Sequence, residues 1–222
     1  MSTEVTEFPS VLRGRTGVVL RLALPLAAVV GLIASVLVVF PYRGAEFYGL
    51  VVTYMVPPAG KETVIPAAVA AGFSPFLVAT YIAGIDMTVG WLMAWNWDFI
   101  TGIPLVGELV ERLMERGQAW MEEQPIVDRS AFLGLILFVF FPMQGSGAVA
   151  GITLGRLVGM PAQRAWLAIM LGALTASFAW AYAAGAIRAA VFVFGLDVVL
   201  RASLVLIASA VFAVLLTRRI HR

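Results

Sequence analysis

The chain lacks cysteine, and its 222 residues include a single histidine, His221. Without cysteine there is no disulfide framework, no thiol nucleophile and no thiolate metal site. A lone histidine excludes a metal site or catalytic triad built on histidine within a membrane domain. We therefore expect no catalytic residue, no metal, no cofactor and no enzymatic activity.

Charge is also scarce, since 13% of the residues are charged, 61% are hydrophobic and the mean hydropathy is +0.96. This composition excludes a soluble domain. Each crossing of a bilayer needs roughly 20 apolar residues, so the length suits four to six membrane segments. We predict an all-α polytopic integral membrane protein with a single transmembrane domain over residues 1–222. The arginines are spread by topology, so no nucleic-acid partner is expected.

Two apolar stretches, 51–66 and 138–151, are interrupted at their middle by Pro and Gly. In both, a Gly follows a Pro by three residues, and a further Pro, Pro75 or Pro161, comes after the stretch. Corresponding Gly/Pro interruptions in two halves of a membrane chain point to a transport site. We interpret both stretches as re-entrant helical hairpins; the alternative is that Gly and Pro only permit kinks and close packing.

About four uninterrupted spans accompany these two hairpins. They are predicted at residues 17–41, 76–97, 163–187 and 198–217. Residues 1–16 form a polar N-terminal leader, and 98–130 form a cytoplasmic connection. Within this connection apolar residues recur at helical spacing opposite charged ones, which predicts an amphipathic helix over 104–123.

The basic residues support this topology, because short cytoplasmic loops are enriched in Lys and Arg. If both termini are cytoplasmic, the basic residues on the outer side of the membrane are only Arg43, Lys61, Arg188 and Arg201. The cytoplasmic set is then Arg13, Arg15, Arg21, Arg112, Arg116, Arg129, Arg156, Arg164, Arg218, Arg219 and Arg222. Because one crossing separates the hairpins, they enter from opposite sides and are inverted relative to each other.

Four short motifs resemble the small multidrug export protein family and, more distantly, the DedA (SNARE-associated) membrane proteins. They are PAGKETVIP at 58–66, AGFSP at 71–75, PMQGSGA at 142–148 and GMP at 159–161. The DedA resemblance implies opposed re-entrant hairpins and, for some members, proton-linked translocation of polyprenyl phosphate or other lipids. DedA proteins carry a pair of arginines after the second hairpin, whereas this chain offers only Gln144, Arg156 and Arg164 there.

Ionisable residues at membrane depth are the main site candidates, because their burial is costly. Lys61, the only lysine, lies between Gly60 and Glu62 at the predicted tip of the first hairpin. In one interpretation Glu62 binds a proton or a cationic substrate, while Lys61 attracts an anionic head group or holds Glu62 ionised until it is displaced. In the other, Lys61 and Glu62 form a structural pair with each other or with the second hairpin. Asp86, predicted near the bilayer centre, is a proton carrier or a fixed partner that neutralises Lys61.

The tip of the second hairpin supplies uncharged hydrogen-bonding groups opposite the first. These residues are Gln144, Gly145, Ser146 and Gly147. Arg156 follows them and either extends to the cytoplasmic surface or points toward the hairpin. The expected substrate or ion site therefore has one charged and one polar wall.

Three functions remain open. The first is a proton-coupled secondary transporter of a prokaryotic plasma (inner) membrane, which moves a lipid or lipid-linked phosphate between leaflets. The second is proton-coupled export of small organic cations by Glu62 and Asp86, and the third is a membrane scaffold. Membrane lipids, protons, the small-molecule or lipid-phosphate substrate and a second copy, as a homodimer, are the expected partners.

Overall fold

The computed structural model describes residues 15–56, 59–97, 125–141 and 147–220, and the regular elements in these ranges are all helices. The all-α prediction is therefore confirmed. In chain order they are α1 (Arg15–Val39), α2 (Gly44–Met55), α3 (Lys61–Ala70), α4 (Pro75–Trp95), α7 (Pro125–Phe140), α8 (Ala148–Leu157), α9 (Ala162–Phe194) and α10 (Leu196–Ile220).

Three helices are long and apolar enough to cross a membrane: Gly17–Val39 within α1, all of α4 and all of α9. They coincide with the first three predicted spans, so the chain is a multi-pass membrane protein. The fourth predicted span, 198–217, falls inside α10, and its crossing of the membrane stays a prediction. The polar leader and the predicted helix at 104–123 lie outside the described residues.

Helix α9 differs from its predicted extent, because it continues past residue 187 to Phe194. Arg188, which we placed after the span, is a good helix former and does not end the helix. The helix ends at Gly195, whose φ of +83° is readily available only to glycine. At 1.5 Å per residue α9 is roughly 50 Å long, well beyond the roughly 30 Å of a hydrocarbon core.

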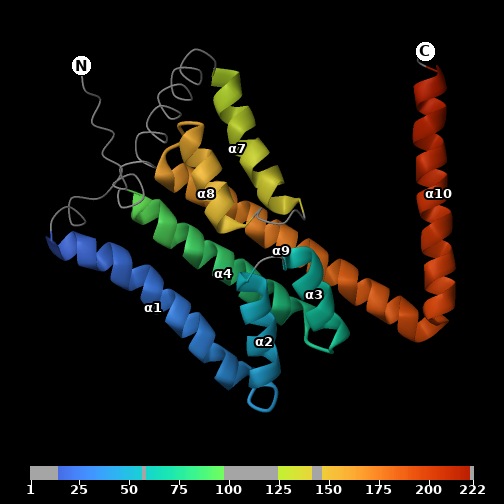
Figure 1. Cartoon of the computed structure of the whole chain (residues 1–222), viewed down its shortest axis with the longest axis horizontal. Helices are drawn as coiled ribbons and strands as arrows, with labels where there is room; N and C mark the ends of the chain where they lie inside the picture. Colours follow the sequence, from blue (N-terminus) through green and yellow to red (C-terminus); the bar gives the residue numbers. More distant parts are fainter. Residues whose placement is uncertain (1–14, 57–58, 98–124, 142–146, 221–222) are drawn as a thin grey trace.

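Two helical hairpins, α2–α3 and α7–α8, approach the middle of α4 from opposite ends (Figure 1). The C-terminal end of α3 leads through Gly72 into the start of α4, whereas the C-terminal end of α8 lies near Trp97, just beyond the end of α4. Their inversion relative to each other in the membrane stays a prediction, because it depends on how the chain is oriented in a bilayer. That the hairpins enter a bilayer without crossing it remains a prediction.

Helices α4 and α9 run antiparallel and carry both hairpins. Pro75 at the start of α4 lies against Gly185, while Trp166 near the start of α9 donates its indole hydrogen bond to the carbonyl of Met87. The core falls into two clusters along this pair, one around Phe47, Ile65 and Tyr81, and the other around Val139, Ile152 and Ile169. Each hairpin thus packs against its own apolar cluster.

Candidate functional site

A buried ion pair joins the first hairpin to α4. Lys61, the first residue of α3, places Nζ 2.6 Å from Oδ2 of Asp86, near the middle of α4. The side chains are only 6% and 5% exposed, respectively. Removing either partner would leave the other charge buried and uncompensated, which is far more costly than losing a surface salt bridge.

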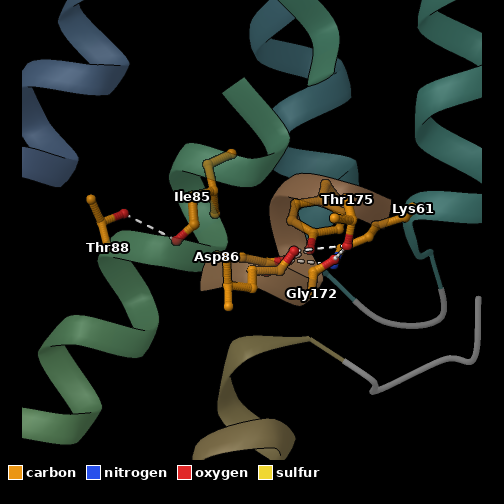
Figure 2. Close-up of polar contacts among 8 residues, drawn as sticks. Lys61, Ile85, Asp86, Thr88, Gly172 and Thr175 are labelled. Carbon is orange, nitrogen blue, oxygen red and sulfur yellow. Dashed lines mark hydrogen bonds and ion pairs between the residues drawn. The ribbon is translucent and has the colours of Figure 1, made fainter. Parts of the chain in front are cut away.

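The second oxygen of the same carboxylate is also occupied. The hydroxyl group of Tyr54, in the last turn of α2, donates a 2.7 Å hydrogen bond to Asp86 Oδ1. Both helices of the first hairpin therefore contact Asp86. Figure 2 shows Lys61 and Asp86 directed toward each other from α3 and α4. An ammonium group has three donors, and Lys61 Nζ has no hydrogen-bond acceptor in the described residues besides its contact with Asp86.

The second hairpin reaches the same carboxylate through the start of α8. Gly147 is the N-cap of α8, and a Cβ atom added to it would lie 3.6 Å from Asp86 Oδ1 and 3.9 Å from Tyr54 Oη. The first turn of a helix presents unpaired N–H groups and partial positive charge. Asp86 therefore lies where the N-termini of α3 and α8 converge, an arrangement that favours negative charge.

Glu62 is oriented differently from its neighbour. Its carboxylate folds back over Gly60 and fills the space that a Cβ atom at Gly60 would need. The Gly60 N–H donates to Thr63 Oγ1 at 3.2 Å, and this contact fixes the start of α3. Glu62 is half-buried and forms no ion pair within the described part of the chain. Lys61 thus pairs with Asp86 rather than with Glu62.

Arg156 lies apart from this cluster, at the opposite end of α8 from Gly147. Its Nη1 donates a 3.1 Å hydrogen bond to the carbonyl of Met160, and its guanidinium carbon lies 5.7 Å from the centre of the Trp97 ring. The structure therefore brings Gly60, Lys61, Glu62, Asp86 and Gly147 together but does not bring Arg156 to them. Gln144, Gly145 and Ser146 lie outside the described residues.

Tyr54 also belongs to this cluster, and the sequence offers it only as one of several residues that could line a site between the hairpins or contact a cation. Helical spacing in the sequence points to Tyr54 as a buried residue. Phe47, Val51 and Tyr54 recur at intervals of four and three residues and so share one face of α2. Phe47 and Val51 are buried. A polar residue that continues such a face must reach a buried partner, and here that partner is Asp86.

The fold defines a helical, multi-pass membrane protein with a buried cluster of ionisable residues. The family model described as "Putative small multi-drug export protein" matches residues 62–179, more than half of the chain. The chain belongs to this family, which confirms the resemblance carried by the four short motifs. The matched segment contains Glu62, Asp86 and Gly147. No curated protein and no solved structure matches the chain, and the likeness to DedA proteins has no support from these comparisons.

Proposed function

We propose that the protein is a proton-coupled secondary transporter that moves a lipid phosphate or lipid-linked phosphate between membrane leaflets. The observation that supports this proposal is the buried Lys61–Asp86 pair at the converging N-termini of α3 and α8. Lys61 and two helix N-termini form surroundings suited to an anion, and Asp86 is the anion that occupies them in this structure. A phosphate group has the charge and the acceptor oxygens to replace it.

Coupling to protons follows from the cost of an unpaired buried charge. When Asp86 binds a proton, Lys61 loses its counter-ion, and a phosphate entering beside Lys61 restores neutrality. When the phosphate leaves, loss of the proton from Asp86 restores the ion pair. Either step alone leaves a buried charge uncompensated, at a cost of several kcal/mol, so the two steps occur together.

Alternating access would arise from movement of one hairpin against the other. The hairpins approach Asp86 from opposite ends of α4, so displacement of either opens the cluster toward one membrane surface (Figure 1). We place the protein in a prokaryotic plasma (inner) membrane with both termini cytoplasmic, because the arginine distribution favours that orientation. The proposed role is transport rather than catalysis.

Export of a small organic cation is a second candidate, favoured by Glu62. This carboxylate is half-buried beside the cluster and has no cationic partner among the described residues. Asp86 is less suited to hold a cation, because Lys61 and Tyr54 occupy its two oxygens. In this alternative Glu62 would exchange a proton for the substrate.

Reconstitution into liposomes tests the first function. We would follow leaflet transfer of a fluorescent polyprenyl phosphate at two pH values, for the wild-type protein and for Lys61→Gln, Asp86→Asn and Glu62→Gln. Wild type should accelerate transfer, and transfer should depend on pH. Lys61→Gln should abolish it, whereas Asp86→Asn should keep lipid binding and lose the pH dependence. The doubly neutral Lys61→Gln/Asp86→Asn protein controls for misfolding, because it contains no unpaired charge, and should also be inactive.

The other outcomes assign the other functions. If wild type moves no lipid phosphate but drives proton-linked efflux of ethidium that Glu62→Gln abolishes, the cation exporter replaces the lipid transporter. If wild type moves neither substrate and all three variants purify in the same oligomeric state, the scaffold is the better description.

A further inference from the structure

Two arginines converge on the turn between α3 and α4, far from the Lys61–Asp86 pair. Gly72 in this turn has a φ of +95°, and a Cβ atom there would lie 3.5 Å from Arg188 Nη2 and 3.7 Å from Arg43 Nη1. Arg43 comes from the residue before α2 and Arg188 from the last third of α9. Segments distant in sequence therefore place two guanidinium groups around one point.

The two arginines differ in their partners. Arg43 Nε and Nη2 donate to the Glu46 carboxylate at 2.9 and 2.7 Å, Nη2 also donates to the Ala71 carbonyl, and the guanidinium lies over Phe73. Arg188 is exposed and has no hydrogen bond, ion pair or ring contact with the residues that the structure describes. One acid for two arginines leaves a net positive charge at the turn.

Two apolar grooves run along α9 and share Arg188 in their walls. One, of about 330 Å³, is lined by Trp180, Ala183 and Ile187 of α9 together with residues of α3. The other, of about 290 Å³, is lined by Pro75, Ala189 and Phe192 and also borders α3. A single cation between two apolar grooves matches a ligand with one anionic group and two hydrocarbon chains.

The depth of Arg188 fits a lipid head group. At 1.5 Å per residue, Arg188 lies roughly 39 Å along α9 from Ala162, so it is near the end of a span that begins there, where a long side chain extends to the head groups. Helix α4 begins beside the same turn, and the side chain of its N-cap, Ser74, makes no capping hydrogen bond. The first N–H groups of α4 therefore add partial positive charge next to Arg43 and Arg188.

From these observations we propose that the α3–α4 turn and the adjoining face of α9 bind one anionic phospholipid of the membrane. Its phosphate contacts Arg188 and Arg43, and its two acyl chains lie in the two grooves. An arginine binds phosphate in a bidentate manner, and basic pockets between membrane helices bind anionic head groups. This site is separate from the Lys61–Asp86 cluster and does not rest on the proposed transport function.

Native mass spectrometry of delipidated protein, titrated with phosphatidylglycerol or phosphatidylcholine, tests the site. Wild type should retain one phosphatidylglycerol in preference to phosphatidylcholine. Arg188→Gln should weaken phosphatidylglycerol binding about tenfold, as expected for loss of a charge-assisted contact. Ala183→Phe, which fills one groove, should weaken it as well. Both substitutions are at exposed positions, so the fold should be kept.

Matched controls separate the site from general surface charge and from the effect of any added ring on α9. Arg201→Gln removes another exposed arginine, and Ala186→Phe adds a ring to α9 at an exposed position that lines neither groove. Both should bind phosphatidylglycerol like wild type. The proposal is overturned if Arg188→Gln binds normally or if the controls lose as much affinity. It is also overturned if soluble glycerol phosphate displaces the lipid and Ala183→Phe has no effect, since the site then binds a free anion.

Discussion

The two hairpins, α2–α3 and α7–α8, each consist of two helices but contact the α4–α9 pair by different chemistry. The first begins its inner helix with Lys61 and Glu62 and contacts Asp86 through an ion pair and the Tyr54 hydrogen bond. The second begins its inner helix with Gly147 and Ala148 and contacts α9 through glycines. The first hairpin is therefore attached through charged and polar groups, and the second through close backbone packing.

The apolar contacts differ in the same way. The first hairpin is supported by a cluster of rings, with Phe40 and Phe47 stacked at 4.5 Å and Phe47 and Tyr81 edge to face at 5.1 Å. In the second, Gly172 of α9 lies so close to α7 that a Cβ atom would be 2.8 Å from the Ile136 carbonyl oxygen. Close backbone contact holds one geometry, whereas side-chain contacts can exchange. We therefore expect the first hairpin to be the moving one in a transport cycle.

The largest effect should come from breaking the ion pair of the first hairpin. Asp86→Leu leaves the Lys61 ammonium buried without a counter-ion, and unfolding should become easier by about 3 to 5 kcal/mol. The double variant Lys61→Met/Asp86→Leu should regain most of this loss. Denaturant titration in mixed micelles measures both free energies of unfolding. Equal losses in the single and double variants would contradict the buried pair.

A smaller effect is expected from crowding the second hairpin. Gly172→Ala pushes a methyl group against the backbone of α7 and should cost about 1 to 3 kcal/mol. Gly134→Ala is the control, because no atom lies within 4 Å of the added Cβ, and it should stabilise the helix slightly. The melting temperatures of the two variants in detergent should move in opposite directions. Similar shifts would mean that this packing is looser than described.

Removing the Tyr54 hydroxyl sharpens the comparison without disturbing the charges. Tyr54→Phe loses the 2.7 Å bond to Asp86 and should cost about 1 to 2 kcal/mol, since Lys61 still binds the other carboxylate oxygen. Tyr42→Phe, at a fully exposed position, is the control. Thermal unfolding of both proteins measures the difference in their stability. A Tyr54→Phe protein as stable as wild type would argue against the hydrogen bond.

The smallest effect should come from the start of α3. Thr63→Ala removes the oxygen that accepts from the Gly60 N–H and should cost about 1 kcal/mol or less, because the site is exposed to competing solvent or head groups. Thr80→Ala serves as the control, since Thr80 Oγ1 only bonds back to the Phe76 carbonyl of its own helix. Melting temperatures that fall equally in the two variants would remove the special role of the α3 cap.

Composition and periodicity are enough to predict the helical class and three spans, because these depend on the length of apolar runs. The end of α9 is harder to predict. Arg188 resembles a span boundary, yet a long side chain on a helix surface need not end the helix, and Gly195 provides the actual stop.

The pairing of the site residues was predictable only in part. The sequence is compatible with Asp86 as a proton carrier or as a partner that neutralises Lys61, and the structure shows the ion pair between them. The place of Arg156 could not be deduced, because it depends on how α8 packs at the Trp97 end. Side-chain contacts between helices depend on how the helices pack together. The spacing of residues along one helix does not determine that packing.

The shortness of α3 and α8, ten residues each, has a consequence for biosynthesis. A segment of this length is too short to leave the translocation machinery as a membrane span. If the hairpins lie within the bilayer, as we propose, their open helix ends and charged residues can enter it only against surfaces already formed by α4 and α9. Since α9 is synthesised after both hairpins, the transport site would be completed late, when the rest of the bundle is already inserted.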